Sequence, residues 1–404
     1  MDTSHVEHPT EPLSRVEVDL GAITANVTAV RRIVGEGPVI CGVVKKNAYG
    51  LGAVTVAHRM AKAGCGMLAV YGPDEAEALT AGAVTTPLLV LYPLRRLTRT
   101  EGLYRPASAG RLHLTVHDPD QLDQLDAVGR AFGIRLPVHL YLDTGMSRSG
   151  LDAAQFADAL KRQPDRRYLR FAGVMSHLAT AGGDAKRAAK QRDRFDDALA
   201  EHRGLIPKDA LIHLANTYGL LREAAYHRAM VRPGLGLYGY GEDDLLGEPT
   251  VAPDHRWTPT VRWVSRVVQV GTYPRHAAVG YGATHKLTRK STLGLVPVGY
   301  GDGYPLALSS NPERRAAVRV RVGDAWHDAD VLGKVNMDQL SVDLTDAVKT
   351  AGVEAATLKG AEVEVYGRDP EARNALPRLA RLAGTTCYEL LTRLSPGLPR
   401  VYRQ

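Results

Sequence analysis

The sequence predicts an α/β protein in which an N-terminal TIM-type (β/α)8 barrel is followed by a smaller, mainly β domain. Eight short apolar runs alternate with helical patterns between residues 40 and 232, and such alternation is typical of a parallel sheet. A stretch of about 250 residues fits the closed barrel, with a doubly wound open sheet as the second choice. Beyond residue 250, apolar and polar residues alternate one by one, as they do in half-buried strands.

The composition is that of an ordinary folded protein. The 404 residues are 44% hydrophobic and 24% charged, which excludes a disordered chain. No apolar run approaches the ~18–20 residues that a membrane span needs. The start of the chain lacks the basic and apolar regions of a secretory signal. We therefore expect residues 1–13 to form a loose tail, and we expect no association with a membrane.

Charge and cysteine content indicate which partners and which cellular compartment are expected for this protein. The formal net charge is +7, but the basic residues are scattered and only 6% of residues are aromatic, too few for a platform on which bases stack. Nucleic acid is therefore not an expected partner. The three cysteines, Cys41, Cys65 and Cys387, are far apart, which argues against a disulfide framework and favours the reducing cytoplasm.

The barrel elements follow from apolar runs and helix start signals. Helices are expected after Asp118, because Pro119 suits the first helical position, after Asp152 as a cap, and over residues 184–202. The eight strands are expected at residues 40–44, 67–70, 87–91, 112–115, 136–142, 169–177, 211–216 and 229–232.

The domain organisation is expected to be a barrel over residues 14–255 and a β domain over residues 256–404. A Pro-rich polar segment, EPTVAPDHRWTPT, lies at this boundary, and Val318, Val320 and Val322 beyond it alternate with arginines. A short early strand, RVEVDL (15–20), has no clear barrel partner. It could pair with the distant β domain.

Polar residues stand at the ends of four predicted barrel strands. They are Lys45, His177, Asn216 and Arg232. Because the chemistry of a (β/α)8 barrel occurs at the carboxyl ends of its strands, these side chains form a candidate site. A lysine in a barrel mouth has its pKa lowered by burial, which suits a covalent bond to an aldehyde cofactor. A solvated lysine at a strand end is the alternative. Strand alternation would send Lys45 and Lys46 to opposite faces.

The segment VVKKNAYGLG (43–52) resembles the cofactor segment of the alanine racemase family, whose members are barrel enzymes that use pyridoxal 5′-phosphate (PLP). The resemblance implies that Lys45 forms the Schiff base and that Tyr49 lies near the phosphate. LDTGMSRSG (142–150) is similar to a second family segment. It implies that Arg148 lies near the substrate carboxylate and the cofactor phenolic oxygen.

Three more barrel segments resemble family motifs in the same order, namely SHLATA (176–181), ANTYG (215–219) and VRPGLGLYG (231–239). The resemblance implies that His177 lies beside the cofactor ring and that Arg232 faces the pyridine nitrogen. It also implies a phosphate site made by Asn216, Thr217 and the backbone N–H groups of Gly234 and Leu235. A glycine-rich turn alone would be weak support.

Four segments of the β domain also resemble the family: VGYGATHKL (279–287), PVGYGDGYP (297–305), VNMDQLSVDL (335–344) and CYELL (387–391). They imply that Tyr281 is the second catalytic base, that Tyr300 lines the entrance, that Met337 contacts the substrate carboxylate and that Tyr388 touches the phosphate. In this family Tyr281 and Met337 reach the site of a partner subunit. The resemblance therefore implies a homodimer with shared sites and no metal.

The expected activity is a two-base interconversion of L- and D-alanine by a PLP-dependent isomerase, with Lys45 on the D side and Tyr281 on the L side. Four positions depart from the family pattern. Tyr141 stands where many members have a lysine, Gly182 where many have an acid, and Leu306 where many have an arginine. Near the end of the chain, Gly397-Leu398-Pro399-Arg400 stands where the usual segment is R-V-P-R. These departures leave open a racemase or epimerase of a different or larger amino acid.

Two other PLP functions have less support. A non-catalytic PLP-binding protein of the barrel class would lack the second domain that carries Tyr281. A barrel-type decarboxylase would need His-Gly-Ser and Cys-Glu-Ser-Gly segments, which this chain lacks.

Overall fold

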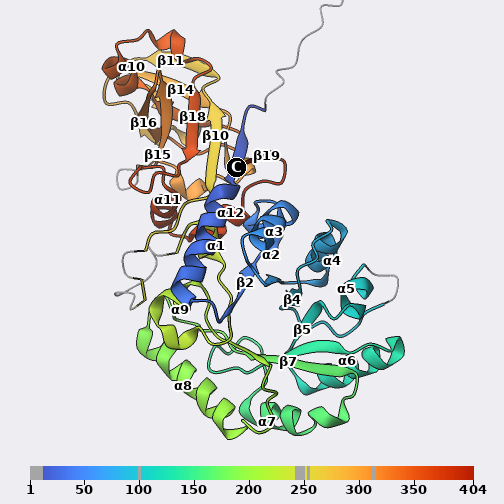
Figure 1. The fold of residues 1–404 in the computed structure, drawn as a ribbon. Coiled ribbons are helices and arrows are strands. Elements are labelled where there is room, and N and C mark those ends of the chain that lie inside the picture. The colour runs from blue at the N-terminus through green and yellow to red at the C-terminus, as the bar shows by residue number, and fades with distance from the viewer. Residues whose placement is uncertain (1–11, 99–101, 242–250, 253–254, 311–314) are drawn as a thin grey trace, which may run out of the picture. The chain divides into compact units, whose positions relative to one another are not determined.

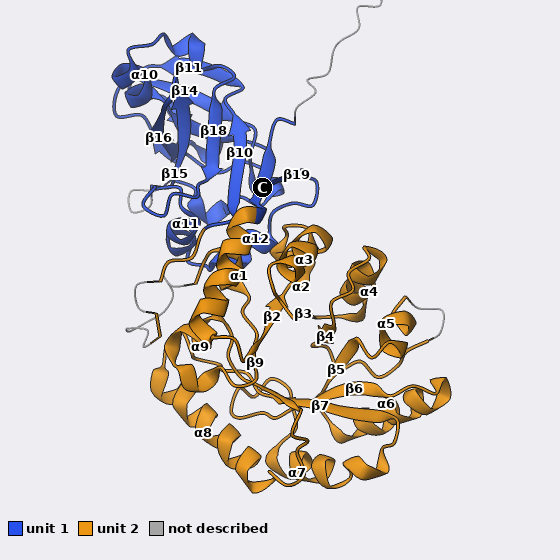
Figure 2. Ribbon diagram, viewed as in Figure 1, with its two compact units in different colours: residues 1–20, 259–404 blue, residues 21–258 orange. Residues whose placement is uncertain are grey.

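The computed structural model describes residues 12–98, 102–241, 251–252, 255–310 and 315–404 (Figure 1). Two compact units are present, one formed by residues 21–258 and the other by residues 1–20 and 259–404 (Figure 2). We call them the barrel unit and the C-terminal unit. Most of the predicted N-terminal tail and much of the predicted Pro-rich linker lie outside the described residues.

The barrel unit is the closed parallel barrel that the alternation of strands and helices predicts, and its strands follow one another in chain order. Nearly all of their residues are buried, as expected for strands that are covered on both faces. The strands are β2 (Val39–Val43), β3 (Met67–Val70), β4 (Leu88–Val90), β5 (Leu112–Val116), β6 (Leu136–Tyr141), β7 (Leu169–Met175), β8 (Leu211–His213) and β9 (Met230–Val231).

Several of these strands are shorter than the apolar runs predict, and β7 and β8 end the furthest before their predicted ends. β7 ends before Ser176 and β8 ends before Leu214. The residues that follow leave the strands because their groups bond elsewhere; the Asn216 side chain, for instance, accepts the N–H of Gly219 and caps a helix. Because the strands end early, the site residues His177 and Asn216 lie in the segments that follow them at the carboxyl rim.

Helices surround the barrel, and Figure 1 shows α4, α6, α7 and α8 on its outside. The two predicted caps are present: the Asp118 carboxylate accepts the N–H of Gln121, and Asp152 and Gln155 form a capping box. No helix in the described part of the chain is long and apolar enough to cross a membrane. The helices are α1 (Leu20–Val34), α2 (Lys45–Tyr49), α3 (Ala53–Lys62), α4 (Pro73–Ala81), α5 (Tyr104–Ser108), α6 (Pro119–Phe132), α7 (Ala153–Lys161), α8 (Ala185–Glu201) and α9 (Thr217–Arg222).

The C-terminal unit is built on a nine-stranded sheet of order β11-β14-β17-β16-β15-β18-β10-β1-β19. The early strand β1 (Arg15–Asp19) lies in this sheet, antiparallel to β10 and parallel to β19. The other strands are β10 (Val261–Arg266), β11 (Gln269–Tyr273), β14 (Ser291–Val296), β15 (Ala317–Val322), β16 (Ala325–Leu332), β17 (Leu340–Asp343), β18 (Glu362–Tyr366) and β19 (Arg400–Arg403). The pair β12 (Ala278–Val279) and β13 (His285–Lys286), and the helices α10 (Thr345–Ala351), α11 (Leu376–Ala383) and α12 (Cys387–Thr392), complete the unit.

Candidate active site

Lys45 stands at the carboxyl end of β2, where the backbone takes an unusual course. The next four residues, Lys46 to Tyr49, all have positive φ between 53° and 55°. A left-handed conformation costs L-residues about 1–2 kcal/mol each, and such strain is concentrated at functional sites. The turn returns the chain sharply, so that Ala48 and Tyr49 are buried while Lys46 and Asn47 are exposed.

The two adjacent lysines have different surroundings, but strand alternation is not the reason. Alternation does not apply to these lysines, because β2 ends at Val43 and the left-handed turn begins right after Lys45. The exposed Lys46 lies 3.9 Å from the Glu75 carboxylate. Burial, and then the positive charge of Arg148, lower the pKa of Lys45. A lowered pKa favours the neutral, nucleophilic amine of Lys45.

Arg232 lies directly after β9 and is 4% exposed. Its guanidinium donates to Nδ1 of His213 at 2.7 Å and to the carbonyl oxygen of Ser176 at 2.7 Å, and it lies 3.4 Å from Nδ1 of His177. Burial lowers its pKa to about 10, so it remains a cation at neutral pH. These partners are neutral acceptors, which leave its charge unopposed.

His177 belongs to the same group of side chains. Burial, followed by the charges of Arg232, Arg148 and Lys45, lowers the pKa of His177 to about 3. His177 is therefore neutral at pH 7. His177 thus lies within electrostatic range of both Lys45 and Arg232 at the carboxyl rim.

The residues predicted to hold a phosphate also come together. The Thr217 hydroxyl accepts the N–H groups of Gly234 and Gly236 at 3.1 and 3.2 Å. A Cβ at Gly234 would lie 2.4 Å from the Tyr49 hydroxyl, so this glycine lets the hydroxyl approach the backbone. The Thr217 hydroxyl accepts these two N–H groups and can still donate its own proton, so the two hydroxyls, beside a turn of backbone N–H groups, fit a phosphate. Leu235 is in the same turn, and Asn216 positions Thr217 by capping α9.

Tyr141 is the last residue of β6, and its side chain is 4% exposed. Its hydroxyl has no hydrogen-bond partner among the described residues. The His117 ring contacts the Tyr141 ring edge-on, at 5.3 Å between centroids, and Nδ1 of His117 likewise lacks a partner there. Arg148 is exposed and forms no ion pair within the described ranges. This corner of the barrel unit thus presents unpaired polar groups that could meet a ligand.

In the C-terminal unit the predicted residues lie on exposed loops. Tyr281 is 74% exposed, Met337 55% and Tyr300 40%. Backbone bonds join two of these loops, since the N–H groups of Tyr300 and Gly301 donate to the carbonyl oxygens of Asn336 and Met337. Tyr388 is half-buried on α12. The loops are fixed, but three aromatic or apolar side chains on them project into solvent.

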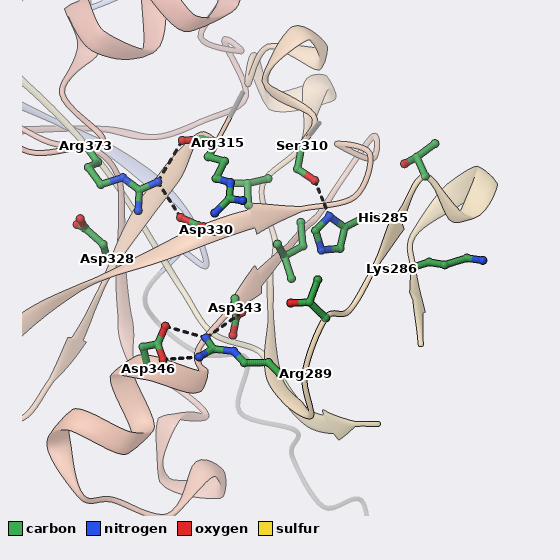
Figure 3. Close-up of a pocket in the computed structure, with 14 residues that line it drawn as sticks. His285, Lys286, Arg289, Ser310, Arg315, Asp328, Asp330, Asp343, Asp346 and Arg373 are labelled. Atoms are coloured by element: carbon green, nitrogen blue, oxygen red, sulfur yellow. Dashed lines mark hydrogen bonds and ion pairs between the residues drawn. The ribbon is translucent and has the colours of Figure 1, made fainter. Parts of the chain in front are cut away.

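A hollow of about 790 Å³ also lies within the C-terminal unit, and two of its arginines form ion pairs with its carboxylates (Figure 3). Arg289 donates to both carboxylate oxygens of Asp346 at 2.7 and 2.8 Å, and Arg373 lies 2.7 Å from Asp330. None of the predicted site residues lines it. In the described part of the chain, no cluster of three or more His, Cys, Asp or Glu residues could hold a metal ion.

The sequence analysis missed four histidines of the barrel interior: His113 and His117 on or next to β5, His139 on β6, and His213 on β8. Each interrupts or closes an apolar strand, and alternation places His113 and His117 on one face of their strand. A histidine inside an otherwise apolar strand was the available signal.

Comparison with known proteins assigns both units to one family. Residues 18–242 match the model of the alanine racemase N-terminal domain, and residues 260–402 match that of the alanine racemase C-terminal domain. Alanine racemases from Symbiobacterium thermophilum and Streptomyces coelicolor are each 33% identical, with 96% of this chain and 96% and 95% of the relatives covered.

Solved structures agree. Alanine racemase from the D-cycloserine producer Streptomyces lavendulae has a TM-score of 0.83 and 28% identity, covering 98% of both chains. The Bartonella henselae alanine racemase, solved with covalently bound pyridoxal phosphate, has a TM-score of 0.79 and 25% identity, covering 97% of this chain and 100% of that one. With both domain models matched and relatives above 30% identity over nearly the whole length, this chain belongs to the alanine racemase family.

Proposed function

We propose that this protein is a PLP-dependent isomerase that interconverts L- and D-alanine. The observation that carries the proposal is the half-buried Lys45, which directly precedes a left-handed turn at the barrel rim and lies within the field of the Arg148 cation. Membership of the alanine racemase family supplies the reaction and the substrate.

The barrel residues fit PLP. Lys45 would hold the cofactor aldehyde, Arg232 would donate to the ring nitrogen, and Arg148 would face the phenolic oxygen. Tyr49, Asn216, Thr217, Gly234 and Leu235, together with Tyr388, would hold the phosphate. When bound, PLP supplies the electron sink that makes the Cα–H of an amino acid acidic.

The protein's own groups then move the protons. Lys45, with a lowered pKa, would take or return the proton on the D side of Cα, and Tyr281 would serve the L side. Arg232 cannot readily give up its proton, so it would hold the ring nitrogen as a donor throughout. Its charge and the neutral His177 would shape the field in which the second base acts.

Assembly as a homodimer with shared sites completes the proposal. Tyr281, Tyr300 and Met337 are exposed, and backbone bonds join the loops of Tyr300 and Met337. Exposed apolar groups of this kind mark an interaction surface. Met337 would contact the substrate carboxylate there. The three cysteines are buried and form no disulfide among the described residues, in keeping with a reducing cytoplasm. Neither a nucleic acid nor a membrane is a proposed partner.

A second candidate is racemisation or epimerisation of a different or larger amino acid. The unpartnered hydroxyl of Tyr141 and the 56% exposed Leu306 favour it, because both replace charged groups common in the family. Gly182 also carries no side chain at the position where many members have an acid.

The test is chiral chromatography of products from a panel of L-amino acids, with the purified protein and added PLP. Rapid formation of D-alanine alone supports the first function, and preference for a larger substrate supports the second. A Tyr141→Lys variant run beside the wild type should raise activity on alanine if the altered residue reshapes the site. No product from any amino acid would overturn both.

A further inference from the structure

Three histidines inside the barrel unit, which the proposed reaction does not use, form an unbroken row of hydrogen bonds that ends on Arg232. Nδ1 of His113 lies 2.8 Å from Nε2 of His139, and Nδ1 of His139 lies 2.8 Å from Nε2 of His213. Nδ1 of His213 lies 2.7 Å from Nη1 of Arg232. We call His113, His139 and His213 the histidine chain.

The histidine chain runs through the barrel from the carboxyl ends of the strands toward their amino ends. Strand register pairs Met175 with His213 and Gly173 with His139, so His139 lies two residues lower. It also pairs Thr115 with His139, which places His113 lower again. His139 and His213 are fully buried, whereas His113 is 7% exposed. The chain therefore runs from Arg232 to near the opposite end of the barrel.

Gly173 makes room for the central link. It lies on β7, between the strands that carry His139 and His213. A Cβ at this position would lie 2.4 Å from Nδ1 of His139 and 2.4 Å from the carbonyl oxygen of Leu211. Any side chain here would displace the nitrogen that bonds His213.

Arginine sets the direction of the chain. A guanidinium has donors and no acceptor, so Nδ1 of His213 must accept and its proton must sit on Nε2. That N–H then donates to Nδ1 of His139, which forces the His139 proton onto Nε2. The same step makes Nδ1 of His113 an acceptor. Each histidine is neutral with the proton on Nε2.

We propose that the histidine chain is a one-way relay of hydrogen bonds that fixes the orientation of Arg232 and keeps its charge unopposed, with His113 as its distal positioning residue. A carboxylate in the place of His213 would hold Arg232 equally well but would cancel its charge. Neutral imidazoles orient the guanidinium and leave the charge directed at its ligand. Burial lowers the pKa of His113 to about 4 and holds those of His139 and His213 well below the ordinary value, consistent with a neutral chain.

The tautomers can be tested without reference to activity. In 15N-histidine-labelled protein, long-range 1H–15N spectra at pH 7 should show His139 and His213 protonated on Nε2 only. Variants lacking one histidine at a time assign the signals. Protonation of His139 on Nδ1, or a doubly protonated ring, would overturn the relay. This result stands whether or not the protein racemises alanine.

The role in positioning rests on the proposed function and needs paired variants. His113→Asn offers an amide oxygen close to the place of Nδ1, whereas His113→Leu leaves the His139 N–H without an acceptor. We expect His113→Leu to lower kcat about ten- to hundredfold, as misplacement of a catalytic group does, with KM nearly unchanged and with shifted His139 and Arg232 resonances. His113→Asn should restore kcat and the resonances.

Gly173→Ala should break the hydrogen bond between His139 and His213 without removing a titratable group. Its kcat and its resonances should resemble those of His113→Leu. Gly183→Ala is the matched control, because a Cβ at Gly183 meets nothing within 4 Å. Equal kcat for His113→Leu and His113→Asn, with unchanged Arg232 resonances, would show that His113 is an ordinary core residue. If the wild type shows no racemase activity, the proposed function fails while the tautomer test still judges the relay.

Discussion

The two units contribute to the candidate site in opposite ways. In the barrel unit the predicted side chains are held before any ligand binds: Arg232 is 4% exposed and lies among fixed acceptors, and Lys45 follows a strained turn. In the C-terminal unit, Tyr281 is 74% exposed and Met337 55%. The difference teaches that the barrel unit holds its predicted residues by contacts of its own, whereas those of the C-terminal unit stand exposed on loops, where the proposed homodimer would use them.

The largest effect is expected at Lys45. Lys45→Ala should abolish racemisation and the visible absorbance of bound cofactor, because it removes both a covalent anchor and a base. The adjacent Lys46→Ala is the control and should retain both, since Lys46 is exposed and pairs with Glu75. Borohydride reduction with peptide mapping should label Lys45. Label on Lys46 would reverse the assignment.

Tyr281→Phe tests the exposed side of the comparison. It should slow proton exchange from L-alanine by about 10²–10⁴, the usual contribution of a general acid or base, and affect D-alanine far less. Because Tyr281 is largely exposed, the melting temperature should stay the same. Isotope exchange from each enantiomer measures the asymmetry, and equal losses from both would assign Tyr281 a structural role.

Gly234→Ala tests the turn over residues 234–236 of the barrel unit, which is proposed to hold the cofactor phosphate. The new Cβ would lie 2.4 Å from the Tyr49 hydroxyl, so the turn or the tyrosine must shift. We expect PLP affinity to fall about tenfold or more, as measured by cofactor titration, because misplaced donors lose hydrogen bonds of about 1.5–3 kcal/mol each to a charged group. Gly183→Ala, where a Cβ meets no atom within 4 Å, should bind PLP normally. Unchanged affinity in Gly234→Ala would remove this turn from the cofactor site.

Acid should weaken the barrel unit through its buried histidines. Burial lowers the pKa of His113 to about 4. Between pH 6.5 and 4, His113 therefore binds a proton in the unfolded chain but stays neutral in the folded protein. The free energy of unfolding should therefore fall as pH falls in this window, by about 1.4 kcal/mol per pH unit for one such histidine. Denaturant melts at pH 7, 6 and 5 measure the slope, and His113→Asn should make it shallower. A flat profile in the wild type would contradict the burial argument.

The smallest effect is expected in the hollow of the C-terminal unit. Arg289 and Asp346 are paired at its exposed rim, and exposed pairs contribute about 0–1 kcal/mol. Arg289→Ala should lower the free energy of unfolding by no more than that and leave racemisation unchanged. A large loss of activity with intact stability would make this hollow part of the functional surface.

Local sequence patterns predicted much of the fold and part of the candidate site. Eight apolar runs marked the barrel strands, Asp118 and Asp152 marked helix starts, and polar residues at strand ends marked Lys45, His177 and Arg232. These signals succeed because strand alternation and helix caps depend on residues a few positions apart. The family motifs added the C-terminal residues, whose exposed loops carry no periodic signal.

Tertiary structure alone decided the rest. The left-handed turn after Lys45 has no sequence signature. Its positions are occupied by Lys46, Asn47 and Ala48, and none of them is the glycine that usually marks a left-handed backbone. The histidine chain joins residues 26 and 74 positions apart, so only closure of the barrel brings them together. Local propensity acts over a few residues, whereas burial, electrostatic coupling and hydrogen-bond direction arise only when distant strands pack against one another.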